Sequence, residues 1–243
     1  MRSKQSGFTL VEIAIVLVII GLLLGGVLKG QELINSAKVK NFATDFRNIP
    51  VFIYGYQDKF RKLPGDMSAV DLGTSMVGVC GLLGVNCRAA GTVGTAGNGV
   101  IEGNWYDVGG NTVVPGAAVD SEAARFWQHI RAAGYASGPT DWGNANYRPQ
   151  NADGGTIGFE TGINMLVTPP VPAPFIAGMT GTYYVCSDGI LGKFAKQLDA
   201  TLDNDETSTG SVRAVPTASA RGTGGTTKAL IVDSASYIVC MAM

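Results

Sequence analysis

The first quarter of the chain opens with a long apolar run. After seven residues that include Arg2 and Lys4, apolar residues continue almost without interruption from 8 to 28. A helix of these roughly twenty-one residues is about 31 Å long, which is enough to cross the hydrocarbon core of a bilayer. Glu12 is the one charged residue in the run. A carboxylate in such a segment costs about 3 kcal/mol on insertion scales, so it indicates a function and requires a partner.

The pattern then becomes amphipathic. Apolar residues recur three or four apart, the spacing of one helical face, at Ile34, Ala37, Phe42, Phe46, Ile49, Ile53, Tyr56, Phe60 and Leu63. We therefore predict that the helix continues and that its second half packs on its own domain. Pro50 predicts a kink or a brief break, because proline lacks a backbone donor and clashes with the preceding turn. Leu63-Pro64-Gly65-Asp66 then ends the helix. Two separate helices that meet near Pro50 are the alternative.

Beyond Asp66 the pattern predicts short elements between long loops. Residues 67–120 are loop-rich, with a turn at Gly97-Asn98-Gly99 that is either isolated or part of a hairpin. One short helix follows a cap at Asp120-Ser121 and ends at Gly134, and a second follows a cap at Asp188. A stiff proline-rich connector occupies 168–174. The expected strands are 156–161, 163–167, 182–186, 229–232 and 237–240.

One short motif links the basic leader to the apolar run. Gly7-Phe8-Thr9-Leu10-Val11-Glu12 stands between the basic leader and the apolar run. The Gly–Phe junction, the acid four residues after the phenylalanine and the apolar run that begins at the junction closely resemble the N-terminus of type IV prepilins and of secretion pseudopilins. The resemblance implies cleavage after Gly7 by a prepilin peptidase, N-methylation of Phe8, and export into a helical filament.

Two simpler interpretations of the apolar run fit less well. A secretory signal has its apolar region before a small-residue cleavage site, but Lys29-Gly30-Gln31-Glu32 follows this run without an Ala-x-Ala pattern. A plain transmembrane anchor fits the length and the hydrophobicity. It does not explain Glu12.

The resemblance also implies an architecture. Pilins have an α+β fold, in which a long N-terminal helix packs along an antiparallel sheet, with a small helix or two and long loops on the other side; the periodicity independently predicts the helix and the later strands. We expect a leader at 1–7, a membrane and filament-core helix at 8–28, its amphipathic continuation at 29–64, and a loop-rich globular domain with disulfides at 65–243.

The function implied by the resemblance is that of a structural subunit in a type IV pilus-like filament. In the family, the acid at Glu12 is thought to meet the N-terminal amine of a neighbouring subunit, here Phe8. The partners are related pilin subunits, the prepilin peptidase and an inner-membrane assembly platform. Many filament-forming pilins carry a proline in the second half of the apolar stretch, whereas this chain has none before Pro50. A minor pilin or tip adhesin, and a pseudopilin of a type II secretion system, therefore stay open as alternatives.

The chain has four cysteines, which fit an oxidising compartment. Cys80 and Cys87 are close enough in sequence for a local disulfide loop, and no zinc-binding spacing accompanies them. Four cysteines allow three connectivities. Cys186 and Cys240 each follow a strand-like run, and pairing them gives the long C-terminal disulfide loop of many pilins.

Net charge and composition exclude few classes of protein, but the basic leader predicts the orientation of the chain in the membrane. The net charge is −1, and removal of Arg2 and Lys4 changes the balance of 18 basic and 19 acidic residues to 16 and 19, or −3, which does not suggest nucleic acid as a partner. Charged residues are only 15% of a chain with 34 glycines, a balance typical of assembled extracellular proteins. The basic leader stays in the cytoplasm, which places the domain outside the inner membrane, and then on a cell-surface pilus or a periplasmic pseudopilus.

No catalytic set is evident in the sequence. His129 is the only histidine, and no nucleophile or carboxylate stands at a recognisable spacing from it, so we expect a structural side chain and no enzyme. Asp203, Asp205 and Glu206 are the weak candidates for a calcium site, because hard cations bind clustered oxygens and some pseudopilins use a C-terminal loop for this. We otherwise expect no cofactor.

Overall fold

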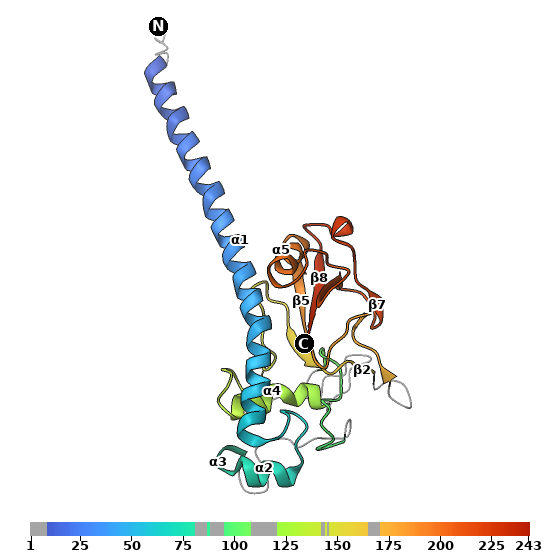
Figure 1. The fold of residues 1–243 in the computed structure, drawn as a ribbon. Helices are drawn as coiled ribbons and strands as arrows, with labels where there is room; N and C mark the ends of the chain where they lie inside the picture. Colours follow the sequence, from blue (N-terminus) through green and yellow to red (C-terminus); the bar gives the residue numbers. More distant parts are fainter. Residues whose placement is uncertain are drawn as a thin grey trace, which may run out of the picture.

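The computed structural model describes residues 9–80, 87, 95–107, 121–141, 144, 146–164 and 171–243. Its first element, helix α1 (Leu10–Phe60), extends far beyond the globular part at its N-terminal end and packs on that part with its C-terminal half (Figure 1). The buried side chains of α1 are Val39, Phe42, Ala43, Phe46, Ile49, Ile53 and Tyr56. The amphipathic spacing therefore marks the packed face correctly from Phe42 onward, whereas Ile34 and Ala37 at its expected start are exposed.

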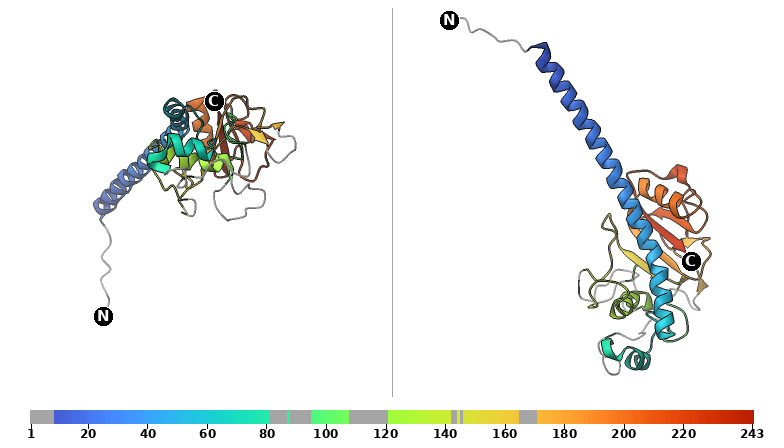
Figure 2. Two further views of the ribbon diagram at one scale, coloured as in Figure 1. Left: turned by 90° about the horizontal axis from the view of Figure 1, so that it is seen from below. Right: turned by 60° about the vertical axis from the view of Figure 1, so that its left-hand side comes forward.

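Helix α1 runs through Pro50 without interruption, so the expected break is wrong, and the helix axis bends only gently (Figure 2). Proline removes one helical hydrogen bond, but the neighbouring Phe46, Ile49 and Ile53 are almost completely buried and hold the helix against the domain. The helix also ends earlier than expected, because Arg61 adopts a left-handed conformation with φ 53°.

A four-stranded antiparallel sheet with the order β1-β5-β8-β6 forms the centre of the domain. Its strands are β1 (Ile157–Glu160), β5 (Tyr184–Leu191), β6 (Val212–Pro216) and β8 (Ser236–Ala242). Because side chains alternate along a strand, Val185 and Val239 face the core beneath the helices, whereas Cys186 and Cys240 face the opposite core. An α+β fold with a long helix on an antiparallel sheet is therefore confirmed.

The shorter helices lie on the same side of the sheet as α1. Helix α5 (Gly192–Leu202) packs directly on α1, with the rings of Phe42 and Phe194 5.9 Å apart. Helix α4 (Glu122–Ala132) places Phe126 over Phe159 of β1, with the ring centroids 4.6 Å apart. The expectation that these helices lie opposite α1 is wrong, because their apolar faces share one core with it.

The other side of the sheet is covered by loops and short strands. Its core combines side chains of β5, β6 and β8 with Trp105, Phe175, Ile176 and Met179. The minor strands are β2 (Ile163–Asn164) with β3 (Val171–Pro172), and β4 (Ile176–Ala177) with β7 (Thr223–Gly224). Part of the expected proline-rich connector is thus paired as β3, and its residues 168–170 lie outside the described residues. Two further helices, α2 (Ala69–Ser75) and α3 (Val77–Cys80), follow the end of α1.

Of the caps expected for the two short helices, the structure contains one and lacks the other. Ser121 caps α4 by accepting the Ala124 N–H at 3.3 Å, and Gly134 follows the helix with φ 85°. Asp120 lies outside the described residues. Asp188 does not cap α5, because β5 continues past it to Leu191. Pairing with β8 extends the strand and overrides the local capping preference.

The strand expected at 229–232 is also wrong. Lys228–Leu230 form a short 3₁₀ helix, η2, and the chain on either side of it does not join the sheet. Ile231 is buried in the core beneath the helices, but Leu230 and Val232 on either side of it are exposed.

A buried ion pair joins the loops on the far side of the sheet. Glu160 of β1 is completely buried, and its carboxylate accepts N–H groups from Trp105 at 3.0 Å and from Phe175 at 3.2 Å. Arg221 donates to both of its oxygens, and also to Ala173 O at 2.6 Å and Asn104 Oδ1 at 2.8 Å. The long glycine-rich loop 216–228 is therefore anchored at its centre.

We predict that Arg221→Leu lowers the free energy of unfolding by about 3 to 5 kcal/mol, because it leaves the Glu160 carboxylate buried without its counter-ion. Denaturant unfolding of the full chain in detergent measures the effect. The exposed Arg47→Gln on α1 is the control, with a change within about 0.5 kcal/mol. The double variant Glu160→Gln/Arg221→Leu recovers part of the loss. An Arg221→Leu protein as stable as the control would contradict this account of the loop.

Candidate functional site

The acid in the apolar run is held by the residue that starts the helix. Glu12 Oε2 accepts both the backbone N–H and the hydroxyl of Thr9, each at 2.8 Å, and the Glu12 N–H donates to Thr9 Oγ1 at 3.3 Å. This reciprocal arrangement is a capping box, and it satisfies donors that the first helical turn leaves free. This role of Thr9 was not predicted from the sequence, although the Thr-x-x-Glu spacing signals it.

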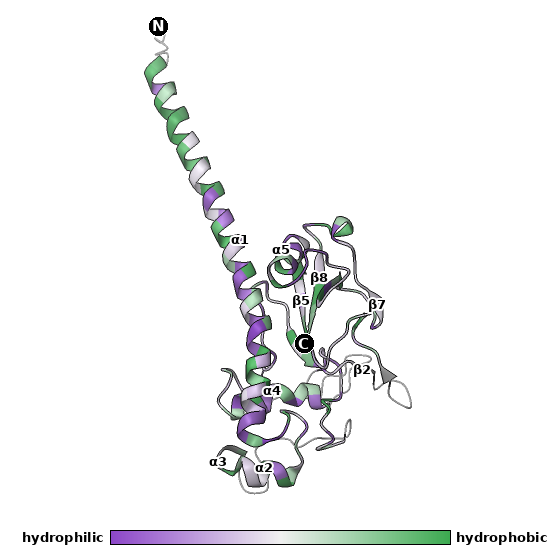
Figure 3. Cartoon of the chain, viewed as in Figure 1, coloured by the Kyte–Doolittle hydropathy of each residue, from purple (hydrophilic) through white to green (hydrophobic). Residues whose placement is uncertain are grey.

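The apolar residues that follow Glu12, up to Leu28, contact nothing in the rest of the described chain. Leu10 is 86% exposed, and the side chains from Val11 to Leu28 remain exposed along the whole segment, which Figure 3 shows as the hydrophobic end of α1. Within the described residues, α1 is also the one helix long and apolar enough to cross a membrane. Exposure of this much apolar surface to water is strongly unfavourable, so the segment requires lipid or other apolar helices around it.

Glycines interrupt this apolar surface. No heavy atom outside the helix lies within 4 Å of a Cβ placed on Gly21, Gly25, Gly26 or Gly30. No neighbour among the described residues therefore requires glycine at these positions. Small residues on an apolar helix let a second helix approach its backbone closely.

The expected processing site lies outside the described residues. Gly7 and Phe8 both precede Thr9, where the structure begins. Cleavage after Gly7, methylation of Phe8 and the pairing of Glu12 with a neighbouring N-terminus thus stay predictions.

The structure forms both of the expected disulfide bonds. Cys80 at the end of α3 is bonded to Cys87, and Cys186 is bonded to Cys240. Cys186 and Cys240 are directly opposite each other on β5 and β8. The second disulfide therefore joins adjacent strands in the middle of the sheet.

The candidate calcium ligands contact donors of the protein itself. Asp203 Oδ2 accepts the Val212 N–H at 2.9 Å, and Asp205 pairs with Lys228. Glu206 Oε1 accepts the Lys228 N–H at 2.9 Å. Across the described residues, no group of three or more His, Cys, Asp and Glu side chains is arranged to hold a metal ion. The geometry thus gives calcium no support.

His129 has a structural contact. It is completely buried on α4, and its Nδ1 accepts the N–H of Gly65 at 2.8 Å. Gly65 adopts φ 98° and approaches the backbone of Glu122 so closely that a Cβ there would lie 2.4 Å from the Glu122 carbonyl oxygen. The histidine therefore fixes the turn that follows α1 against α4.

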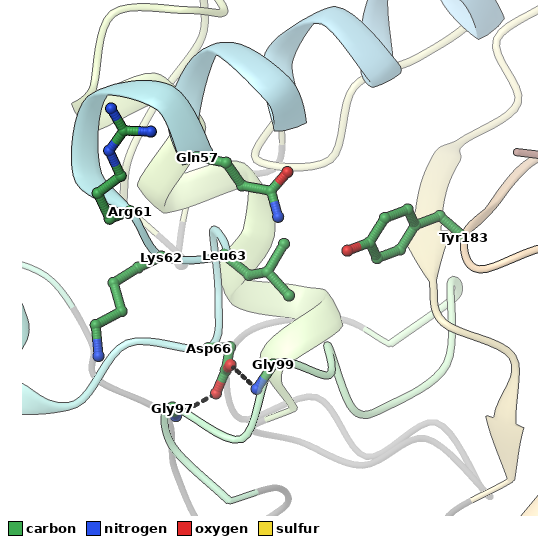
Figure 4. Close-up of a pocket in the computed structure, with 8 residues that line it drawn as sticks. All are labelled: Gln57, Arg61, Lys62, Leu63, Asp66, Gly97, Gly99 and Tyr183. Atoms are coloured by element: carbon green, nitrogen blue, oxygen red, sulfur yellow. Dashed lines mark hydrogen bonds between the residues drawn. The ribbon is translucent and has the colours of Figure 1, made fainter.

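A hollow of about 460 Å³ lies beside the end of α1 (Figure 4). The described residues that line it are Gln57, Arg61, Lys62, Leu63, Asp66, Gly97, Gly99 and Tyr183. The Asp66 carboxylate accepts the N–H groups of Gly97 and Gly99, the latter at 2.8 Å, and Lys62 pairs with Asp71 at 3.3 Å. These lining residues place no nucleophile beside a general base, so they form no catalytic set.

Asp66 belongs to a buried acidic group behind this hollow. Glu122 is completely buried, and its Oε2 accepts the Glu102 N–H at 3.0 Å. Burial, followed by the negative charges of Asp66 and Glu102, raises the pKa of Glu122 to about 8. Glu122 is therefore largely protonated below that pH.

The N-terminus matches one known family model, the prokaryotic N-terminal methylation motif, over residues 2–28. No curated protein and no solved structure matches the chain. The motif covers the leader, the capping box and the exposed apolar half of α1, and the remainder of the chain has the α+β layout with two disulfides. The protein is therefore type IV pilin-like or pseudopilin-like.

We predict a pH-dependent effect of Glu122→Gln. Because the pKa of Glu122 is raised in the folded protein, its contribution to stability is complete below the unfolded value near 4.5 and is lost as the pH rises through about 8. Glutamine cannot ionise, so the variant is more stable than the wild type at pH 9 by at least about 1 kcal/mol, and this advantage disappears at pH 5. Urea unfolding at both pH values measures it.

The exposed Glu32→Gln is the matched control for Glu122→Gln, and its difference from the wild type should stay within about 0.5 kcal/mol at both pH values. A Glu122→Gln difference that is the same at pH 5 and pH 9 would show that Glu122 is not protonated in the folded protein.

Proposed function

We propose that this protein is a structural subunit of a type IV pilus-like filament. It is cleaved after Gly7, N-methylated at Phe8, and assembled through the apolar half of α1. The observation that carries the proposal is the complete exposure of this half, which presents apolar residues on every side and a single acid in its first turn. A bundle of identical helices buries such a surface on all sides.

Assembly needs more than apolar burial. Lipid tails are as apolar as leucine, so transfer of the helix from a bilayer into a bundle gains little hydrophobic free energy. Close packing at the exposed glycines supplies one contribution. Glu12 supplies the other, by pairing with the new amino group of Phe8 on a neighbouring subunit, which neutralises two charges in a dry environment.

The capping box prepares Glu12 for that pair. Thr9 uses Glu12 Oε2, and no contact within the described chain occupies Oε1. The carboxylate is thus held at the helix start with one oxygen accessible to a neighbour. Thr9 immediately follows Phe8, so the Phe8 amine of an adjacent subunit meets Glu12 when the two helices are offset along their axes.

The proposal places the protein in two locations. Before assembly, the apolar half of α1 spans the inner membrane with the globular domain outside the cytoplasm. A prepilin peptidase and an assembly platform act on the protein in that membrane. After assembly, the same segment lies in the filament core. The two disulfides are compatible with an oxidising compartment.

The processing step predicts a defined product. The exported form should have the mass of residues 8–243 plus one methyl group, with both disulfides formed. Intact-mass measurement with N-terminal sequencing tests this directly. An exported protein that retains Met1–Gly7, or whose Phe8 amine is unmodified, would contradict the processing step.

The assembly step predicts a specific role for Glu12. Glu12→Ala should leave the protein in the membrane fraction at wild-type levels and reduce its amount in sheared filaments at least tenfold, because the Phe8 amine then lacks its buried counter-ion. Quantitative immunoblots of both fractions measure the two effects. Glu32→Ala, at an exposed acid farther along the same helix, should assemble normally. Equal recovery of Glu12→Ala and wild type from filaments would rule out the pairing.

A further inference from the structure

A second hollow, of about 310 Å³, lies between α1, α4 and the segments that lead from α4 to β1. It is separate from the N-terminal assembly segment and from the hollow in Figure 4. The described residues that line it are Asp45, Asn48, Ile49, Phe52, Trp127, Arg131, Tyr135, Ala136, Ser137, Pro149, Gln150 and Ile157. Its volume lies at the lower end of the range of small-molecule sites.

Asp45 is the exceptional residue in this lining. Its carboxylate is partly buried, and among the described residues it has neither a hydrogen-bond donor nor a cation in contact. By contrast, Asp58 on the same helix pairs with Arg61 at 3.5 Å, and Asp153 pairs with Lys38 at 2.5 Å. Burial raises the pKa of Asp45 to about 6, so the group is ionised at neutral pH. A carboxylate partly removed from water gains most from a cation beside it.

Aromatic side chains line the same hollow. Phe52 comes from α1, Trp127 from α4, and Tyr135 from the turn after α4. The faces of such rings attract cations that approach within about 6 Å, and the rings also accept apolar carbon atoms. Asn48 and Gln150 add neutral groups that hydrogen-bond to a polar ligand. The walls therefore suit an organic cation better than a bare metal ion.

Arg131 also lines the hollow, but its guanidinium is already engaged. Nε donates to Ser137 O at 3.1 Å, and Nη1 donates to Pro139 O at 2.8 Å and to Tyr147 O. The guanidinium also lies over the Trp127 ring, 5.7 Å from its centroid. These contacts hold Arg131 to the loop after α4. They explain why its guanidinium forms no ion pair with Asp45.

We propose that this hollow binds a primary ammonium group on a short apolar chain, with Asp45 as the anionic contact and Phe52 and Trp127 as the walls. The ammonium group is supplied either by a free amine or by a lysine side chain from a second copy of the protein. Both present the same group to Asp45. The proposal is independent of filament assembly, since none of its residues belongs to the apolar half of α1.

The test uses the full chain in detergent micelles and two probes of equal size. n-Butylamine is charged at neutral pH, whereas n-butanol is its neutral counterpart. Isothermal titration at pH 7.5 should show that the wild type binds the amine at least tenfold more tightly than the alcohol. Asp45→Asn should remove this preference, while Asp58→Asn, at an exposed acid on the same helix, should keep it.

The aromatic walls are tested by a second pair of variants. Phe52→Leu should weaken amine binding at least threefold, because it removes a ring face from the hollow. Phe60→Leu, on the same helix but outside the hollow, should bind like the wild type. Equal affinity of the wild type for amine and alcohol, or unchanged amine binding by Asp45→Asn, would overturn the proposal.

A crosslinking experiment distinguishes the two sources of the ammonium group. A carbodiimide joins a carboxylate to a contacting lysine as an amide, and a mixture of ¹⁴N- and ¹⁵N-labelled chains reveals links between copies. An Asp45–lysine link of mixed isotope composition in the assembled protein identifies a second copy as the source. Butylamine binding without such a link identifies a free amine.

Discussion

The apolar N-terminal half of α1, which contacts nothing else among the described residues, is the constraint on which the whole molecule depends. About half of α1 is exposed on every side, and the other half is packed on the sheet and on α5. One rigid element therefore belongs to two environments. The segment that leaves the domain must be surrounded by lipid or by similar helices, and the domain must hold the packed half firmly enough to place it there.

The domain meets this requirement with two cores on the two faces of one sheet. The core beneath α1 combines α4, α5 and one face of the strands, while the other core depends on loops anchored by Glu160 and Arg221. Burial of loop backbone is unfavourable when its N–H and C=O groups lack partners. The Glu160–Arg221 ion pair, with its several hydrogen bonds, supplies partners that regular secondary structure would otherwise provide. The Cys186–Cys240 bond strengthens the sheet between these two layers.

The sequence predicted the features that depend on local periodicity. The length of the apolar run, the buried face of α1 from Phe42 onward, the Ser121 cap and the Cys80–Cys87 loop follow from spacing within short segments. The Cys186–Cys240 pair was implied by the resemblance to pilins. The errors come from tertiary contacts. Pro50 is tolerated because its neighbours are buried, and Asp188 lies in a strand because β8 pairs with Ser187 and Ile190 on either side of it. Glu160 and Arg221 are 61 residues apart. Asp45, which has no partner among the described residues, is recognisable only once the surrounding side chains are in place.

The position of β8 determines when this domain completes its fold. Residues 236–242 form an interior strand between β5 and β6. The pairings of β8 with β5 and with β6 therefore cannot form until these last residues have been exported. If α1 enters the membrane first, more than two hundred residues (29–242) cross the bilayer before the sheet closes. The helix then serves as a tether for an unfolded chain, and the Cys186–Cys240 bond forms as one of the last steps of maturation.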